Sequence, residues 1–412
     1  MSEYLNLSNY PKDWKVDYGS DFLTLGSGVS PTSVTFSQDG NTSYMKVDDY
    51  NNPNNHTFIK TTKLKFNKEE NQIPLTKVDS IIIAKRGAAI SKNRVRIAQQ
   101  IIAVDTNLMT IAIKRNHDTT YFKYLLELIN LESIADTTSI PQLNNFHLNE
   151  ASFCFPILPE QQKIASILTS VDEVIEKTEA QISKLQDLKK GMMQELLTKG
   201  IGHTEFKDSP VGRIPKEWEV VCIKTIANVV DSMHQTPVFS DKGKPMVRVT
   251  EIRQSDYLDI SGAMFVTDEI FVNFSKNYQP RRGDILIARV GAYYGANSFV
   301  NEESVFCLGQ NTASIRAEKI HPEFLFTYMN SQNVRAQIDD AVAVGAQPSL
   351  SLKAINELKI VLPPLDEQIK ISSSINSVYD EITSTKLKSK KYKALKMALM
   401  QDLLTGKVRV NA

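Results

Sequence analysis

Cysteine is scarce in this chain of 412 residues, which contains only Cys154, Cys222 and Cys307. Three widely spaced cysteines do not suit a disulfide framework or a zinc site, so we expect reduced thiols that behave as small buried side chains. No apolar run reaches the roughly 18 residues of a membrane-spanning helix. The polar N-terminus also lacks the apolar core of a signal peptide. These absences predict a cytoplasmic protein without a membrane partner.

Neither sign of charge dominates, because 48 Lys and Arg residues stand against 47 Asp and Glu residues. This balance argues against a protein that coats nucleic acid with a uniformly basic surface, but it allows local basic patches. A hydrophobic content of 42% is ordinary for a globular protein, and the length predicts two or three domains.

The common catalytic motifs are also missing. The chain has no GxxxxGK[ST] phosphate loop, no GxGxxG, no HExxH, no CxxC and no GxSxG. The stretch NPNN (52–55) resembles the Asn-Pro-Pro-aromatic motif of amino-methyltransferases only loosely, because it lacks the second proline and the aromatic ring. The six histidines are isolated, so we expect no metal site. The sequence therefore favours a binding protein over an enzyme.

What the chain does contain is an internal repeat. The segment FPILPEQQKIASIL, which begins at Phe155, returns as LPPLDEQIKISSSI from Leu362. When Glu160 is aligned with Glu367 the match continues without a gap to the far end, where MQELLT (193–198) meets MQDLLT (400–405). A gapless match of this length indicates a duplicated structural unit.

The repeat extends, more faintly, into the regions between these segments. PKDW (11–14) returns as PKEW (215–218), and IIIAKRGA (81–88) returns as ILIARVGA (285–292). We therefore predict four parts: a globular domain in 1–155, a long helix in 156–204, a second domain in 205–362, and a second long helix with the C-terminal tail in 363–412. The helices have diverged less than the domains, which suggests a shared scaffold that carries two different domains.

Both long segments show apolar residues at alternating spacings of four and three, the pattern of a coiled-coil seam. The seam residues expected to pair are Ile164, Leu168, Val171, Ile175, Ile182 and Leu185 in the first helix, and Ile371, Ile375, Val378, Ile382, Tyr392 and Leu399 in the second. Threonine and lysine interrupt both seams at equivalent positions, Thr178 and Lys189 in the first and Thr385 and Lys396 in the second. Polar residues on a seam weaken it but fix its register.

An isolated helix cannot cover such a stripe, so each helix needs a partner helix. The equivalent seam in the same chain is the obvious partner, and a pseudo-twofold relation between the repeats makes the two helices antiparallel. About 40 residues per helix would give a rod of roughly 60 Å. Pairing between two chains would use the same seam, so self-association in the absence of other partners stays an alternative.

Each globular region combines apolar strand patterns, such as DSIIIAKRG and GDILIARVG, with helical patterns, which predicts a mixed α/β fold. Basic and amide side chains, which can bond phosphates and base edges, gather at strand ends and in loops. The candidates for DNA binding are Lys46, Lys85, Arg86, Lys92 and Arg94 in the first domain, and Arg248, Arg253, Arg289, Tyr293, Tyr294, Gln310 and Asn311 in the second.

With the duplicated helices, the start LPEQQKIA, the end QELLTKG and the following GRIPKEWEV, the chain resembles the specificity subunits of type I restriction–modification systems. The resemblance implies two target recognition domains, each of which reads one half of a bipartite DNA site, and paired helices that set the gap. It implies partners: double-stranded DNA, two methyltransferase subunits and restriction subunits. It also implies that S-adenosylmethionine and ATP bind to those partners and that this chain binds no cofactor and has no catalysis of its own.

Two other classes of protein remain as alternatives. A fragment of a fused restriction–methylation enzyme would methylate DNA by itself, and the missing methyltransferase motif argues against it. A structural coiled-coil adaptor would bind all DNA equally or not at all.

Overall fold

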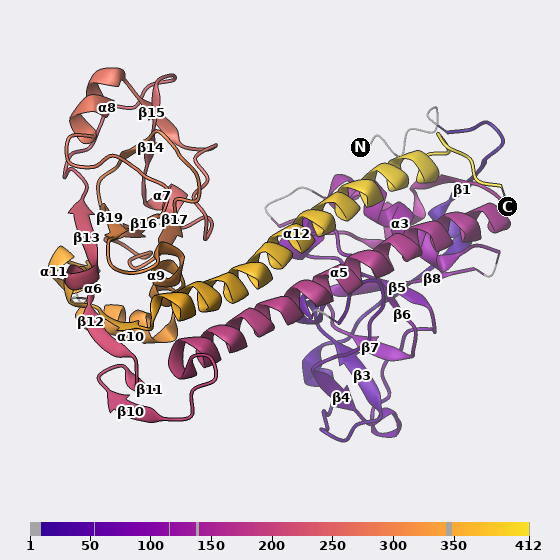
Figure 1. The fold of residues 1–412 in the computed structure, drawn as a ribbon. Coiled ribbons are helices and arrows are strands. Elements are labelled where there is room, and N and C mark those ends of the chain that lie inside the picture. The colour runs from indigo at the N-terminus through magenta and orange to yellow at the C-terminus, as the bar shows by residue number, and fades with distance from the viewer. Residues whose placement is uncertain (1–9, 53, 115, 137–139, 343–347, 412) are drawn as a thin grey trace. The chain divides into compact units, whose positions relative to one another are not determined.

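The computed structural model describes residues 10–52, 54–114, 116–136, 140–342 and 348–411. They form two compact units, one from Met1–Gln181 with Thr385–Ala412 and the other from Ile182–Ser384. The two long helices are α5 (Leu158–Lys199) and α12 (Leu365–Leu404), shown in Figure 1. The division between the units falls inside both helices. Our sequence boundaries assign each helix to one segment, whereas in the structure each unit holds one domain and half of each helix.

The first domain contains three sheets. A four-stranded antiparallel sheet has the order β2-β8-β5-β6, a three-stranded sheet has the order β4-β3-β7, and β1 pairs with β9. The elements are β1 (Lys15–Tyr18), α1 (Gly19–Phe22), β2 (Leu23–Ser27), β3 (Thr42–Met45), β4 (Leu64–Phe66), β5 (Ser80–Ala84), α2 (Ala88–Ser91), β6 (Arg96–Ala98), β7 (Ile102–Val104), β8 (Leu108–Ile113), α3 (Thr119–Ile129), α4 (Asn145–Asn149) and β9 (Ser152–Phe155).

The second domain repeats this plan. Its sheets have the orders β13-β19-β16-β17, β15-β14-β18 and β12-β20, and a hairpin of β10 and β11 precedes them. The elements are β10 (Phe206–Ser209), β11 (Gly212–Pro215), β12 (Glu219–Cys222), α6 (Ile223–Ile226), β13 (Ala227–Asp231), β14 (Lys244–Val247), α7 (Val249–Ile252), β15 (Met264–Val266), α8 (Asp268–Phe274), β16 (Asp284–Ala288), β17 (Asn297–Phe299), β18 (Cys307–Leu308), β19 (Thr312–Ala317), α9 (Pro322–Met329), α10 (Gln332–Ala341), α11 (Leu352–Glu357) and β20 (Lys359–Leu362).

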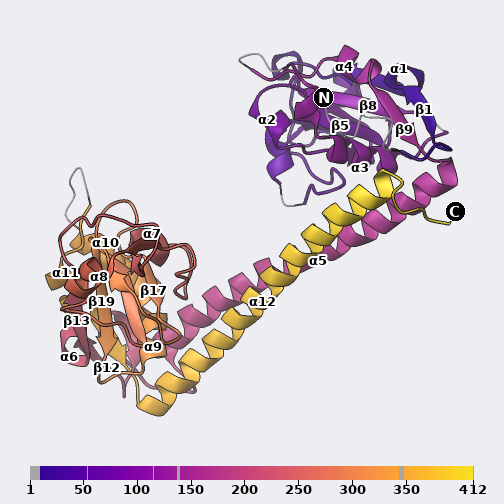
Figure 2. The same ribbon diagram turned by 90° about the horizontal axis from the view of Figure 1, so that it is seen from above.

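The apolar runs of the sequence become the central strands. Every residue of β5 and of β16 is buried, as expected for strands that are covered on both faces. In the first domain α3 covers the sheet and carries eight buried residues. The Asp118 side chain begins this helix by accepting a hydrogen bond from the Tyr121 amide at 2.7 Å. In the second domain α9 holds the equivalent place (Figure 2).

The repeated sequence at the start of the long helices has a structural cause. Gln161 is buried, donates to the Pro156 carbonyl at 2.9 Å, and accepts from the Asp118 amide at 2.9 Å. Gln368 makes the same two bonds, to the Pro363 carbonyl at 2.7 Å and from the His321 amide at 2.8 Å. Each glutamine therefore ties the first turn of a long helix to the start of the helix that covers the domain sheet.

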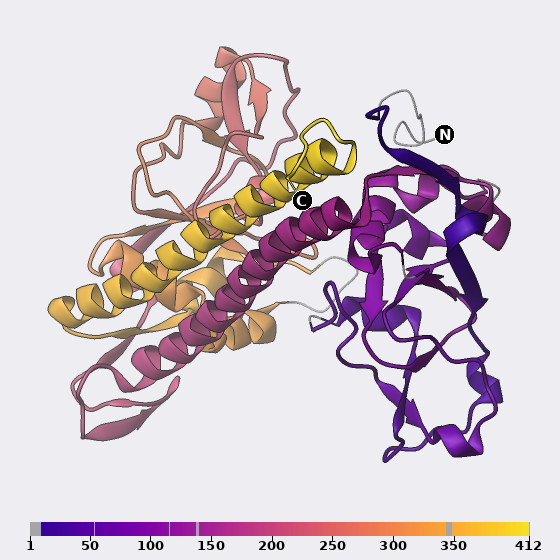
Figure 3. The ribbon, with the colours of Figure 1, turned by 90° about the vertical axis from the view of Figure 1, so that its right-hand side faces the viewer.

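In each unit the two long helices run antiparallel. Within the first unit Lys396 of α12 contacts Asp172 of α5 at 2.7 Å, and Lys393 contacts Glu179 at 2.6 Å, so that residue numbers fall along α12 as they rise along α5 (Figure 3). The expected seam residues face inward to different degrees. Those that are buried are Ile164, Leu168, Ile175, Ile371, Ile375 and Ile382, and those that are half-buried are Val171, Ile182, Leu185, Val378, Tyr392 and Leu399.

The ends of the seam enter the domain cores. Leu403 and Leu404 pack with Ile164 in the core of the first unit, and Leu197 packs with Ile371 in the core of the second. All three cysteines are free thiols; Cys154 and Cys307 are buried, while Cys222 is half-buried. None of the helices among the described residues is both long and apolar enough to cross a membrane.

Candidate nucleic-acid interface

The loops at one edge of the four-stranded sheet bring several predicted residues together in the second unit. Because neighbouring strands are antiparallel, β13 and β16 end where β19 begins. The Arg289 amide, just beyond β16, donates to the Asn311 carbonyl, just before β19, at 2.8 Å. Segments that are far apart in the sequence therefore form one loop surface. Loops on a rigid sheet are frequent carriers of binding residues.

Arg289 does not present its guanidinium to solvent at this surface. It forms an ion pair with Asp231 at the end of β13, and its Nε donates to the Leu350 carbonyl at 3.1 Å. Its side chain is only 11% exposed. The geometry makes Arg289 a brace between three loops and speaks against a direct contact with DNA, for which the sequence made it a candidate.

Arg248 and Gln310 lie beside each other at the same edge. The Gly309 amide donates to the Val247 carbonyl at 2.8 Å, which holds the two chain segments together. Arg248 forms a 2.8 Å ion pair with Glu251 and lies over the Phe239 ring. Gln310 is exposed and its side-chain oxygen accepts from Thr236 at 3.2 Å.

Arg253 and Tyr293 are the most accessible predicted pair in this unit. The Arg253 guanidinium stacks 4.2 Å from the centre of the Tyr293 ring, and both residues are exposed. Tyr294 differs, because its hydroxyl donates to Asp339 at 3.0 Å and its ring lies under Arg335. An arginine that is preorganised on an aromatic ring keeps its free N–H groups available for a phosphate or a base.

The first unit presents a shorter set at the equivalent edge. Lys46 follows β3, and Lys85 and Arg86 follow β5. The Lys85 ammonium donates to Ser27, at the end of β2, at 3.2 Å. Partial burial, together with the neighbouring Arg86 charge, lowers the pKa of Lys85 below its ordinary value. Arg86 is exposed.

Lys92 and Arg94 do not join this set. They lie beyond α2, where the intervening Asn93 donates to the Glu127 carbonyl of α3 at 2.6 Å. Lys92 is exposed, whereas Arg94 bonds the Tyr50 carbonyl at 3.0 Å and the Asn51 side chain at 2.7 Å. Arg94 also lines a polar cavity between the first domain and the long helices. Arg94 is therefore engaged within its own unit, whereas Lys92 is open to solvent.

Two glycines fix the backbone of the strand-end loops in the same way. Gly87 and Gly291 have φ of 68° and 89°, a left-handed conformation that favours glycine. The Gly87 amide donates to the Pro141 carbonyl at 2.9 Å, and the Gly291 amide donates to the Pro348 carbonyl at 3.0 Å. The two domains thus share the fastening of this loop although its side chains differ.

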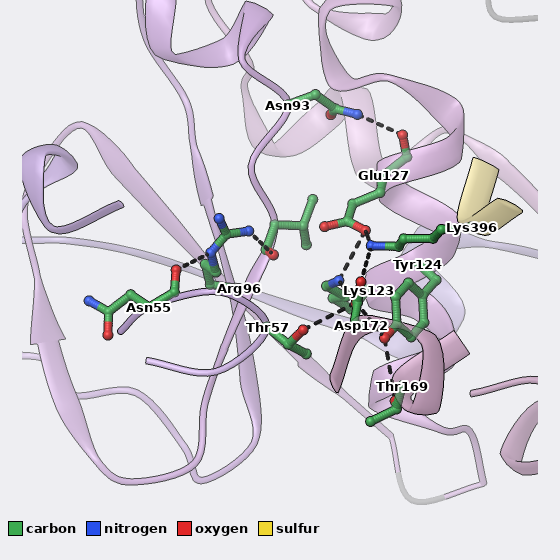
Figure 4. Close-up of polar contacts among 11 residues, drawn as sticks. Asn55, Thr57, Asn93, Arg96, Lys123, Tyr124, Glu127, Thr169, Asp172 and Lys396 are labelled. Carbon is green, nitrogen blue, oxygen red and sulfur yellow. Dashed lines mark hydrogen bonds and ion pairs between the residues drawn. The ribbon is translucent and has the colours of Figure 1, made fainter. Parts of the chain in front are cut away.

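A buried cluster of charges joins the first domain to both long helices (Figure 4). Lys123 and Glu127 come from α3, Asp172 from α5 and Lys396 from α12. Lys396 contacts Asp172 at 2.7 Å and Glu127 at 3.5 Å, and Lys123 contacts Glu127 at 3.0 Å and Asp172 at 3.6 Å. The Tyr124 hydroxyl donates to Asp172 at 2.8 Å.

Burial and pairing set the charge states in this cluster. Burial by itself would raise the pKa of Asp172, but the Lys123 and Lys396 ammonium groups outweigh it and lower the pKa below the ordinary value. For Lys396, burial is outweighed by Glu127 and Asp172, and its pKa is raised. Lys123 is 1% exposed, and there burial prevails and lowers the pKa.

Sequence reasoning did not single out Lys123, Glu127 or Asp172. The one available signal was the lysine within the second seam, because a cation on a buried stripe needs an acidic partner. The partner Asp172 lies outside the spacing of four and three that defines the seam.

A domain with one sheet order occurs twice, and each copy is followed by a long helix, so the chain is a tandem duplication. The family model for the type I restriction modification DNA specificity domain matches twice, at residues 11–187 and 215–392. The chain therefore belongs to this family.

Individual relatives agree in length as well as in sequence. The chain is similar to the type I restriction enzyme MjaVIII specificity subunit of Methanocaldococcus jannaschii, with 25% identity covering 97% of this chain and 94% of the relative. The MjaIX specificity subunit of the same organism is 22% identical over 98% and 96% of the two chains. The fold is similar to that of a type I S subunit from M. genitalium, with a TM-score of 0.60 and 15% identity over 98% and 99% of the chains.

We predict that Asp172→Asn destabilises the fold by about 3–5 kcal/mol, because it leaves Lys123 and Lys396 without half of their counter-charge in a buried site. Urea unfolding at pH 7 measures this change. Glu173→Gln, at the exposed neighbouring position, is the matched control and should change stability by less than about 0.5 kcal/mol.

The same variant has a defined pH dependence. Since the pKa of Asp172 is lower in the folded state, its charge stabilises the fold above the unfolded value of about 3.9, and this contribution is lost as the pH falls through the folded value. The difference between wild type and Asp172→Asn should therefore shrink below about pH 4. A difference that grows on acidification would contradict this assignment.

We predict opposite effects for two arginines of the second domain. Arg253→Ala should leave the melting temperature unchanged and weaken DNA binding, with a loss of about 1–3 kcal/mol if it contacts guanine. Arg289→Ala should lower the melting temperature, because it removes the ion pair with Asp231 and the hydrogen bond to the Leu350 carbonyl. Thermal melting together with fluorescence anisotropy on a cognate duplex separates the two. A stable Arg289→Ala variant with relaxed sequence preference would contradict this assignment and show that Arg289 contacts bases.

Proposed function

We propose that this chain is the DNA-reading subunit of a type I restriction–modification complex, in which each domain recognises one half of a bipartite site. The observation that carries the proposal is the repetition of one sheet order with different side chains at the same strand-end loops. A shared scaffold with two different loop sets suits a protein that makes two different readings of one ligand.

The loop chemistry supports reading by both charge and hydrogen bonds. The second domain offers the stacked Arg253 and the amide side chain of Gln310, which suit a phosphate or guanine and an adenine, respectively. The first domain offers Lys46, Lys85 and Arg86 at the equivalent edge. The two domains thus differ in donors and acceptors, as two unlike half-sites require.

The long helices fit the role of a spacer that sets the gap between half-sites. Each domain is tied to the first turn of one helix through Gln161 or Gln368, and to the last turns of the other helix through the apolar core. A domain fastened to both helices cannot move independently along either of them.

Catalysis belongs, on this proposal, to partner subunits. The chain recruits two methyltransferase subunits, which bring S-adenosylmethionine and methylate adenine, and restriction subunits, which use ATP; this chain binds neither cofactor. A second solved structure with a similar fold, at a TM-score of 0.56 and 15% identity, is described as the basis of complex assembly and conformational transition of the type I R-M system. We infer that such an assembly acts in the cytoplasm.

The proposal predicts that the chain and its methyltransferase partner, expressed in a host without other adenine methylation, mark one bipartite motif with one gap length. Long-read sequencing of modified adenines measures this. The chain alone should give no methylation, whereas methyl transfer by the purified chain would favour the fused-enzyme alternative. Equal affinity of the complex for its motif and for a scrambled duplex would support the adaptor alternative.

A second prediction concerns the spacer. Lys189 of α5 contacts the Tyr379 ring of α12. Because the helices are antiparallel, Lys184, five residues before Lys189, and Ser384, five residues after Tyr379, lie at the same level of the pair. Inserting one heptad at both points lengthens the pair by about 10 Å, which should widen the gap by about three base pairs and leave both half-sites unchanged. Long-read sequencing of modified adenines again measures the gap length and the half-site sequences. A change of half-site sequence at constant gap would contradict a spacer role.

A further inference from the structure

Each long helix carries one lysine among its expected seam positions, and the two lysines are equivalent. In the gapless alignment of the repeats Lys189 of α5 matches Lys396 of α12. Both side chains are largely covered, with 25% and 17% exposure. A covered ammonium group is unfavourable unless partners satisfy it, so the partners of these lysines are informative.

Lys396 has partners on two other elements of its unit. Its ammonium lies 2.7 Å from Asp172 on the opposite helix and 3.5 Å from Glu127 on the helix that covers the domain sheet. It also lies 5.1 Å from the centre of the Tyr124 ring. One side chain therefore connects α12, α5 and the first domain.

Lys189 makes the corresponding connection in the second unit with different chemistry. Its ammonium lies 2.9 Å from Asp256 of the domain and 4.8 Å from the centre of the Tyr379 ring on the opposite helix. Tyr379 stands where the alignment places Asp172 in the other repeat. The Tyr379 ring in turn packs edge-on against Tyr257 of the domain at 4.7 Å.

The apolar part of the seam does not by itself define one register. Isoleucine, leucine and valine occupy most of the seam, and the hydroxyl side chains at Thr178, Thr385 and Ser389 are small. Sliding one helix by a heptad, about 10 Å, therefore again brings mostly aliphatic side chains against each other. A lysine does not tolerate such a shift, because its ammonium would then lie among aliphatic groups without a counter-charge or an aromatic face.

We propose that Lys189 and Lys396 are positioning residues that hold the antiparallel helices in one register and fasten each recognition domain to that register. The inference rests on the proposed function, because it concerns how the gap between half-sites is kept to a single length. Lys396 does so through Asp172 and Glu127, and Lys189 does so through Tyr379 and Asp256.

Lys189→Met is the decisive variant. Methionine retains the apolar stem of the side chain, and Asp256, at 42% exposure, stays solvated when it loses its partner, so we expect the variant to fold. In complex with the methyltransferase partner it should methylate the same half-sites. The fraction of sites with a neighbouring gap length should rise at least about tenfold, which corresponds to about 1.4 kcal/mol of register preference.

The controls separate register from general stability. Lys190→Met changes the exposed neighbour and should keep a single gap length. Lys189→Arg keeps the charge and should largely restore the wild-type gap. Lys396→Met should also broaden the distribution of gap lengths. Its site is more buried, so if this variant fails to fold, the result for Lys189→Met decides between the outcomes.

A folded Lys189→Met complex with one gap length and wild-type half-sites would overturn the proposal. Loss of folding in Lys189→Met would also overturn it, because the lysine would then be a general stability element. If the proposed function itself were wrong, the result would be different, because even the wild-type complex would then methylate no bipartite motif.

Discussion

The structure depends on the burial of two amphipathic helices against each other and against two separate cores. Neither α5 nor α12 has enough apolar surface to be stable by itself, and long helices in water gain most of their stability from packing. Ile164 and Leu403 share one core, and Leu197 and Ile371 share the other. Each domain therefore completes its interior with residues from both helices.

This constraint explains which parts of the repeat are similar in sequence and which are not. Gln161 and Gln368 must each satisfy a proline carbonyl and a helix-start amide in a buried position, and a substitution there would leave both groups unpaired. The strand-end loops face fewer such demands, namely their backbone fastenings and, in the second domain, the Arg289 brace. The helix starts are accordingly alike, while the loops around Arg86 and Val290 differ.

Much of this architecture could be predicted from the sequence because periodic patterns are local. The gapless repeat, the heptad spacing and the apolar runs of β5 and β16 led directly to a duplicated α/β fold with two paired helices. The sheet order was beyond reach, since the parallel pairing of β3 with β7 joins segments far apart in the chain. The candidate interface was harder still. Arginine is a residue type that commonly contacts bases, and only the folded structure shows that Arg289 is a brace, through Asp231, 58 residues away in sequence, and Leu350.

The glycine fastenings at the strand ends have a consequence for how such a protein can change. Gly87 and Gly291 fasten their loops through the backbone, by a left-handed turn and one hydrogen bond from the glycine amide to a proline carbonyl. Neither of these hydrogen bonds involves a side chain of the loop. Point substitutions at loop positions other than the bracing Arg289 can therefore alter what the loop recognises while its path stays the same, so new targets become accessible one residue at a time without a refolded intermediate.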